Sequence, residues 1–426
     1  MTATAEASLL SLLDTPRPRD WEQARAKAEA ALDGRALPTT REEDWKYTDL
    51  RALQGLQLAS PHLEPGDVSH HILPESIGTR LVFSNGYFDP HASNTSALPP
   101  GVRLLPLAQA SEAASLLGSL AIPGTGDLFA ELNTARFTNG ALIYVPKHVK
   151  VAAPLHVIFH AESREGACWS LPRLLVVLEP EADVTLVEEF TSQGAVLTSA
   201  VSELSLAPGS RMSHVRVQRE GLEAFHFGTQ VVKLGGDARY SQQSIHLGGR
   251  LSRHCPQVAL SAEGASLELL GLAILAGNQL ADTHASIDHR VPRASTRQLF
   301  KAIVDDQARA VFNGRILVRP GAQQTDARQQ CRTLLLSGQA RVDAKPELEI
   351  FADDVKCAHG AAVGQLGPEE VFYLQSRGMD IESARNLLVY GFAAEVLAAI
   401  EVPSLRRQLR QVLLERTQGN ARPDQR

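Results

Sequence analysis

The chain of 426 residues has few cysteines, few aromatic side chains and no long apolar run. Its four cysteines form no C-x-x-C pair, so neither a disulfide framework nor a zinc ribbon is expected, and free thiols fit a reducing compartment. No stretch of about 18 consecutive apolar residues occurs, which argues against a membrane-spanning helix. The first residues lack a cationic segment followed by an apolar one, so we expect no export signal and predict a cytoplasmic protein.

Charge and motif content exclude further classes of protein. The net charge is -6 and no basic block stands out, so a nucleic-acid partner is not suggested. The sequence contains no G-x-x-x-x-G-K-[ST] loop, no G-x-G-x-x-G after a strand-like run and no G-x-S-x-G elbow. Any nucleotide chemistry is therefore expected in a partner, and the chain itself is predicted to be non-catalytic.

Residue patterning divides the chain into three regions, which are residues 1–80, 81–366 and 367–426. The first region is expected to be helical to about residue 60, with helices over Ala5–Leu13 and Arg19–Leu32, since Ala, Leu, Glu, Arg and Lys favour helices. The last region is expected to be helical again, with segments from Pro368 towards Arg377, over Ile381–Ala399, and from Pro403 through Arg416.

The residue pattern of the middle region is typical of a β-protein, because short runs of Val, Leu and Ile are broken by Gly, Pro, Asp and Asn. The predicted strands include Ala141–Val145, Leu155–Phe159, Leu174–Leu178, Val184–Glu188 and His214–Val217. Little between residues 140 and 365 keeps a helical period, so this region is predicted to be mainly β.

A turn followed by a small residue repeats along the middle region. The small residues Ala182, Ser210, Ala238 and Ala265 are spaced 28, 28 and 27 positions apart. Similar turns recur less evenly at Gln307-Ala308, Gly321-Ala322 and Gln339-Ala340. A fixed period of this size is typical of a solenoid, in which each coil stacks on the last. The alternative is a sandwich of β-hairpins, but the strands of a sandwich recur about every 8–12 residues and show no longer period.

One short segment could hold half of a metal site. If the chain is extended around Cys357 and His359, the two side chains lie on one face of a strand, with Cα atoms roughly 6–7 Å apart. A thiolate and an imidazole could share a soft metal, and a second chain would have to supply the remaining ligands. The alternative is a buried thiol beside a hydrogen-bonded histidine.

Other clusters of potential ligands are weaker. Asp282, His284, Asp288 and His289 fall within eight positions, but their spacing matches no known metal motif, and a hydrogen-bonded polar strand face accounts for them better. His254 and Cys255 are adjacent, so on a strand they point to opposite faces and do not form a joint site.

A long ordered string of residues resembles the SufB/SufD family. The segments are Val311–Val318 (VFNGRILV), Ala322–Ala327 (AQQTDA), Leu334–Ser337 (LLLS), Val342–Ile350 (VDAKPELEI), Ala352–Leu366 (ADDVKCAHGAAVGQL), Phe372–Gly378 (FYLQSRG) and Ala384–Leu388 (ARNLL). Arg41–Thr48 and the chain length resemble SufD more than the usually longer SufB. Cys255 sits in no motif like those of the SufB cysteines, whereas Gln323-Gln324 and Gln330–Thr333 depart from the family pattern and argue against a role for Cys331.

This resemblance implies a right-handed parallel β-helix between helical end segments. It also implies pairing with a SufB-like paralogue through the β-helix, and binding of a SufC-like ATPase by the helices of residues 368–416. In that family an iron–sulfur cluster is built transiently at the SufB–SufD interface, so no cofactor is expected to bind stably to this chain alone. By resemblance, His359 would be the ligand or polar group on the SufD side, with Cys357 beside it.

Three alternatives remain open at this point. The chain could be a SufB-like scaffold that holds the nascent cluster, or a homodimeric SufD that acts alone in handling iron or sulfur. It could also be a β-helix enzyme acting on polysaccharides, with Asp282–His289 and Asp305-Asp306 as the candidate carboxylates. The aromatic content of 5% weighs against the enzyme, because sugar-binding platforms need exposed rings.

Overall fold

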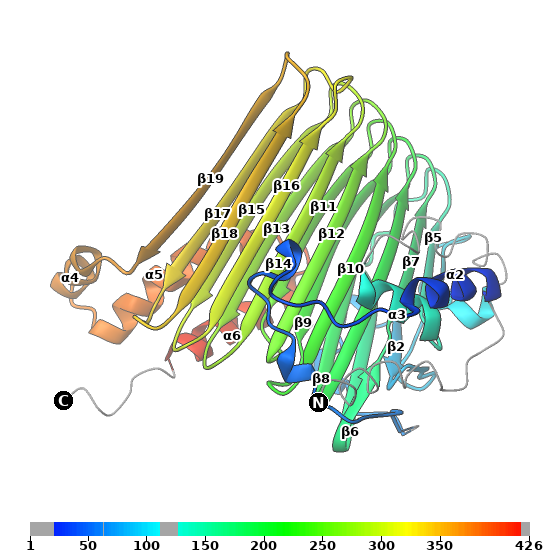
Figure 1. The fold of residues 1–426 in the computed structure, drawn as a ribbon, viewed down its shortest axis with the longest axis horizontal. Helices are drawn as coiled ribbons and strands as arrows, with labels where there is room; N and C mark the ends of the chain where they lie inside the picture. The colour runs from blue at the N-terminus through cyan, green and yellow to red at the C-terminus, as the bar shows by residue number, and fades with distance from the viewer. Residues whose placement is uncertain (1–20, 63, 111–126, 419–426) are drawn as a thin grey trace.

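The computed structural model describes residues 21–62, 64–110 and 127–418. The chain winds into a solenoid of stacked parallel strands, with helical segments near the start and the end of the sequence (Figure 1). From β8 onward each coil contributes one strand to each of two faces. The prediction of a mainly β, parallel solenoid is therefore confirmed.

The two faces share one long strand, β8 (Asp183–Leu206), whose first part pairs on the first face and whose second part pairs on the other. The first face continues through β9 (Arg211–Arg219), β11 (Arg239–His246), β13 (Ser266–Leu275), β15 (Ser295–Val304), β17 (Asp326–Leu335) and β19 (Lys356–Gln365). The second face comprises β7 (Arg173–Leu178), β10 (Phe225–Leu234), β12 (Leu251–Leu260), β14 (Leu280–His289), β16 (Arg309–Val318) and β18 (Arg341–Ile350).

The turns at one edge of the solenoid explain the repeat in the sequence. Each small residue follows a residue with a left-handed backbone, and each is fully buried against its neighbours: Ala182, Ser210, Ala238 and Ala265. Backbone bonds join successive turns, as where Gly209 N–H donates to Gly236 O at 2.8 Å. Ala308 and Ala340 lie at the opposite edge, and the turn at Gly321-Ala322 is longer, so these positions do not share the regular spacing.

The first strands close one end of the solenoid. The strands are β1 (Leu58–Ala59), β2 (Arg80–Ser84), β3 (Tyr87–Phe88), β4 (Arg103–Pro106), β5 (Ala141–Val145) and β6 (Leu155–Ser170). β2 and β5 begin the two stacks, and the antiparallel strands β3 and β4 pair with them. β5 has the bounds expected from the sequence, and the other four predicted runs lie inside β6, β7, β8 and β9.

Helices cover parts of both outer faces. The helices α5 (Ile381–Ala398) and α6 (Pro403–Gln418) pack on the first face, where Val215, Val217 and Leu272 meet Val396 and Leu409. The helices α2 (Glu22–Leu32) and α3 (Leu128–Arg136) lie near the closed end, and α4 (Pro368–Ser376) stands beyond β19 (Figure 1). The three C-terminal helices agree with the expected ones, and none of the described helices is long and apolar enough to cross a membrane.

The N-terminal region is less helical than its composition predicts. Ala5–Leu13 lies outside the described residues, and the helix expected from Arg19 is described only from Glu22. Apart from β1, residues 33–62 and 64–79 form turns and loops, including the short 3-10 segments η2 (Glu43–Trp45), η3 (Arg51–Leu53), η4 (Ser69–His71) and η5 (Pro74–Ser76). A further 3-10 segment, η6 (Leu107–Gln109), follows β4. The part around η2 lies across the second face, where Thr48 donates to Asp282 at 2.7 Å and Glu43 pairs with Lys345 at 2.6 Å, whereas Leu73 packs on the side of the first face with α5 and α6. Such tertiary contacts override the helical propensity.

Candidate functional site

β19 is the last strand of the first face and carries Cys357 and His359. It pairs with β17 on one side, and among the described residues no strand pairs with its other side. β18 ends the second face in the same way, because it pairs with β16 alone in the described structure. The solenoid is therefore open at this end, and its inward-facing side chains on β18 and β19 are not covered by another coil.

Cys357 and His359 both belong to the inward-facing row of β19. Their partners in register on β17 are Ala327 and Gln329, which are both buried inside the solenoid. Cys357 is half-buried against the same interior, whereas His359 is exposed because no further coil lies over it. The strand thus presents a thiol and an imidazole side by side at the open end.

The electrostatics of this pair limit what it can do alone. Partial burial raises the pKa of the Cys357 thiol, so the sulfur stays protonated near neutral pH unless a metal or a cation displaces the proton. The described residues include no group of three or more His, Cys, Asp or Glu side chains arranged to hold a metal ion. Cys357 and His359 can therefore supply two ligands between them, and their role as half of a metal site stays a prediction.

The residues between Asp282 and His289 do not form one site. Asp282 and His284 lie on the outer face of β14, where Arg253 contacts both and Asp44 lies 3.6 Å from His284. His289 lies inside the solenoid, 2.8 Å from the Thr296 hydroxyl, and burial lowers its pKa to about 4. These groups are paired within the fold, which agrees with the interpretation as a polar strand face.

Cys255 lines a cavity on the second face. The cavity has a volume of about 580 Å³ and is also lined by Trp45, Arg253, His284 and Lys345. Burial raises the pKa of Cys255 to about 12, so the thiol is neutral and a poor nucleophile. His254, the neighbour of Cys255, points into the solenoid, as strand alternation requires.

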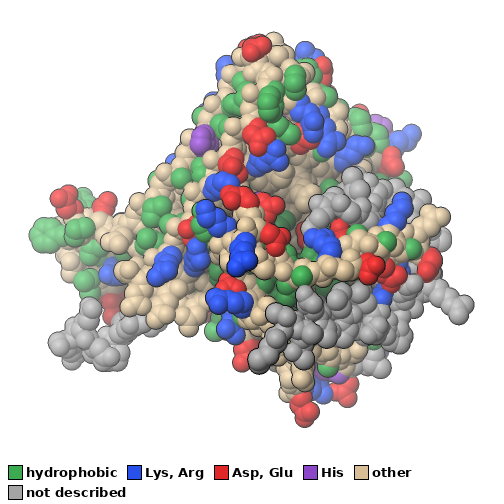
Figure 2. Space-filling view, viewed as in Figure 1, with side chains coloured by type: hydrophobic (Ala, Val, Ile, Leu, Met, Phe, Trp, Pro, Cys, Tyr) green, Lys and Arg blue, Asp and Glu red, His purple; other side chains and the backbone are tan. Residues whose placement is uncertain are grey.

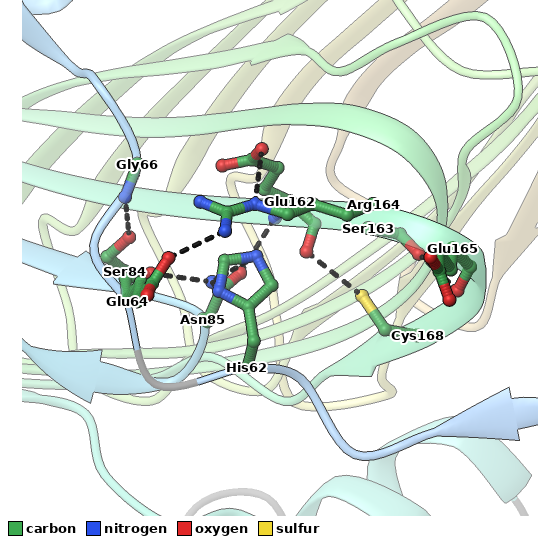
Figure 3. Close-up of polar contacts among 10 residues, drawn as sticks. All are labelled: His62, Glu64, Gly66, Ser84, Asn85, Glu162, Ser163, Arg164, Glu165 and Cys168. Carbon is green, nitrogen blue, oxygen red and sulfur yellow. Dashed lines mark hydrogen bonds and ion pairs between the residues drawn. The ribbon is translucent and has the colours of Figure 1, made fainter.

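The remaining cysteines are also buried, neutral thiols. Burial raises the pKa of both Cys168 and Cys331 to about 11. Cys168 lies 3.7 Å from the Glu162 carbonyl oxygen, beside a polar group in which Arg164 pairs with Glu64 at 2.6 Å (Figure 3). In this view the dashed contacts join β6 to the loop before β2, so the group ties down a turn of the fold.

A polar network inside the coils was not predicted from the sequence. Arg216, His214 and Glu188 lie buried between the faces, with His214 Nε2 3.2 Å from Glu188 and its Nδ1 2.8 Å from the Tyr240 hydroxyl. Burial lowers the pKa of His226, His246 and His254 in the same interior. The available signal was the alternation of polar and apolar residues on β9, in which His214 and Arg216 flank Val215.

Apolar side chains gather outside the solenoid at α4. None of the nine residues of this helix is buried, and Phe372 and Tyr373 are 71% and 57% exposed. Figure 2 shows this group at the end of the molecule where α4 projects. Val363 of β19 and Phe351, which follows β18, are also exposed at the open end. Exposed apolar side chains such as Phe372 and Tyr373, adjacent on one helix, are typical of surfaces that bind other molecules.

Comparison with known proteins covers nearly the whole chain. A family model described as SUF system FeS cluster assembly, SufBD core domain, matches residues 159–392, and a SufBD N-terminal region model matches residues 11–157. An iron-sulfur cluster assembly SufBD family protein of Synechocystis sp. is 38% identical over 92% of this chain and 90% of its own length. The iron-sulfur cluster assembly protein SufD of Escherichia coli is 31% identical over 91% and 90%, and the chloroplastic protein ABCI7 of Arabidopsis thaliana is 31% identical over 88% and 81%.

Proposed function

This chain belongs to the SufBD family of SUF-system iron–sulfur cluster assembly proteins, and from that membership we propose that it is a SufD-like, non-catalytic subunit of an ATPase-driven assembly complex. In this role the iron–sulfur cluster is cargo that the complex builds and releases. The observation that carries the proposal is the open end of the solenoid, where Cys357 and His359 lie on β19, a strand that pairs with β17 on one side and, among the described residues, with no strand on the other.

The partner at the open end is proposed to be a SufB-like paralogue. β18 and β19 expose backbone N–H and C=O groups along their free sides, and such edges bind other strands readily. A paralogue with a solenoid of the same kind could continue both faces and bury Val363 and Phe351, which are 53% and 61% exposed here. A second copy of this chain could use the same edges, so a homodimer competes with the paralogue.

The ATPase is proposed to bind at α4 and the adjoining helix. Exposed Phe372 and Tyr373 offer an apolar anchor on α4, a helix with no buried residue. Ile381 and Leu387 on α5 extend this exposed group, at 52% and 47%. Aromatic anchors of this type contribute much of the free energy of binding at protein interfaces.

Cys357 and His359 are proposed to form one wall of the assembly site. A neutral imidazole and a thiolate are both good ligands for iron, and the paralogue would supply the other ligands. Pairing of the subunits would also remove water from the open end. The iron would then displace the thiol proton that partial burial retains in the isolated chain.

The test is anaerobic cluster reconstitution on the complex co-purified with its paralogue and ATPase. His359→Ala should lower the cluster yield by about tenfold or more while all subunits still co-purify, because a ligand is lost and the interface is kept. His148→Ala, at an exposed histidine of the closed end, and Cys331→Ser, at a buried thiol, are the matched controls. An unchanged cluster yield with His359→Ala and Cys357→Ser would remove the proposed site.

A further inference from the structure

A row of polar side chains leads through the interior of the solenoid to His359. Gln298 on β15, Gln329 on β17 and His359 on β19 occupy the same register position on three successive strands. Gln298 and Gln329 are 1% exposed, so they lie in the interior. Their neighbours in that interior include the apolar rings of Phe300 and Phe312.

The two buried amides are linked to each other, and each keeps one polar atom without a partner. Gln329 donates from Nε2 to Gln298 Oε1 at 2.7 Å. Two buried atoms of the pair have no hydrogen-bond partner among the described residues: Gln298 Nε2 at one end and Gln329 Oε1, at the end next to β19. A buried amide oxygen without a partner costs about 1–3 kcal/mol, so such an atom in a native fold calls for an explanation.

The interior is shaped to hold the Gln329 amide in this place. A Cβ atom added at Gly314, on the opposite face, would lie 2.3 Å from Gln329 Nε2. The absence of a side chain at Gly314 therefore leaves room for the amide. Phe312 lies beside the same position, so the amide is enclosed by apolar atoms.

We propose that Gln329 is a positioning residue for His359: when the exposed imidazole turns inward, the unpaired Oε1 of Gln329 accepts the N–H of one ring nitrogen and leaves the lone pair of the other nitrogen facing the open end. Adjacent strands lie about 4.8 Å apart, so an imidazole one strand further on is within reach of the amide oxygen. Amide ladders of this kind form along parallel strands in register, and here the imidazole is the last rung. The inference rests on the proposed role of His359 in the assembly site.

The consequence of this bond is a single tautomer of His359. A neutral histidine in water exchanges between the Nδ1–H and Nε2–H forms, and only the nitrogen without the proton can bind a metal. Histidine ligands generally donate their other N–H to a carbonyl or carboxylate, which fixes both the tautomer and the ring orientation. Gln329 would do this from inside the solenoid, before any partner binds.

The experiment measures the tautomer of His359 in the isolated full-length chain by nitrogen NMR with 15N-labelled histidine. The chain has 14 histidines, and the His359 signals are assigned by their loss in His359→Ala. One tautomer should dominate in the wild-type chain at pH 8. In Gln329→Met, a substitution of similar length without the amide, the two tautomers should mix.

Two further variants make the result decisive. The double variant Gln298→Met, Gln329→Met removes both linked amides together, so it leaves no new unpaired group and should fold while still mixing the tautomers. Gln330→Met changes the next residue of β17, which points outward and pairs with Arg332, and should leave the tautomer unchanged. Mixed tautomers in the wild-type chain, or one tautomer in the double variant, would overturn the inference.

Cluster reconstitution distinguishes a failure of this inference from a failure of the proposed function. If His359→Ala lowers the cluster yield, Gln329→Met should also lower it, by a smaller factor, with the complex intact. If His359→Ala leaves the yield unchanged while Gln329→Met mixes the tautomers, the site proposal fails and the positioning role stands.

Discussion

The two ends of the solenoid differ in whether their last strands are flanked by other strands and whether their side chains are buried. At the closed end, β2 and β5 are flanked by the antiparallel strands β3 and β4, and most of their side chains are buried. At the open end, no residue of β18 or β19 is fully buried. The closed end thus satisfies its own edges, whereas the open end keeps backbone groups and apolar side chains available for a partner.

Ion pairs on the outer side of the second face differ between the two ends in the same sense. Near the closed end, Arg173 and Glu203 form a fully buried ion pair, with Arg173 also donating to Asn133 at 3.1 Å and to Thr134 at 2.9 Å. Near the open end the comparable ion pair, Arg315 with Glu349, lies on the outside and is exposed. The ion pair near the closed end is thus buried, whereas the one near the open end stays at the surface.

The largest expected effect comes from removing Arg173. Arg173→Met takes away the guanidinium that faces Glu203 beneath α3, and breaking a buried pair on one side costs about 3–5 kcal/mol of the free energy of unfolding. Arg315→Met at the open end should cost much less, because surface ion pairs contribute little. Urea denaturation of both variants measures the difference, and equal losses would contradict the contrast between the two ends.

A smaller effect is expected from changing the free edge of β19. The Lys356 N–H donates to Thr325 O at 2.8 Å, so by alternation the Ala362 N–H faces β17 and the Ala361 N–H faces the open side. Ala361→Pro removes only the outward N–H, which an edge strand tolerates, and should weaken binding of the paralogue roughly 10- to 100-fold, or about 1.4–2.7 kcal/mol. Binding of the ATPase should not change.

The converse variant is Phe372→Ala on α4, which should weaken ATPase binding and leave paralogue binding intact. Gln375→Ala, at an exposed polar residue of the same helix, is its control. Pull-down titrations with each separate partner give the two affinities. Loss of both partners with either variant would mean that the edge and the helix form one surface instead of two.

Much of this architecture was predictable from local patterns. The small residues from Ala182 to Ala265 are buried at tight turns where only small side chains fit, so the coil period was visible in the sequence. The extended segment at Cys357 and His359 was visible too, because it lies in a string that resembles a known family. Membership of that family is confirmed by the comparisons, whereas the role of the two side chains stays a prediction.

The features that could not be predicted depend on register and on neighbouring helices. On β9 the apolar residues Val215 and Val217 face outward under α5 and α6, so the polar residues His214 and Arg216 face the interior, against the usual order. The row formed by Gln298, Gln329 and His359 appears only when the strands are aligned. The exposure of His359 follows from the lack of a covering coil, which no local pattern encodes.

The smallest expected effect concerns the pH dependence of the free energy of unfolding. It comes from a histidine in the interior of the stacked coils, away from the open end. His289 is buried inside the solenoid, and burial lowers its pKa to about 4 from an unfolded value of 6.5, with Asp288 opposing the shift. Below pH 6.5 the unfolded chain therefore binds a proton that the folded chain excludes, so stability is fully present above pH 6.5 and falls as the pH drops towards 4.

Between pH 6 and pH 5 this single group should lower the free energy of unfolding by about 1 kcal/mol. His289→Gln keeps a polar side chain near Thr296 without a titrating ring, so its stability should fall less steeply over that interval. Denaturation curves at pH 8, 6 and 5 give the slopes for both proteins. Parallel slopes would assign the acid sensitivity to other groups, first to the buried His246 and His254, whose pKa values burial also lowers.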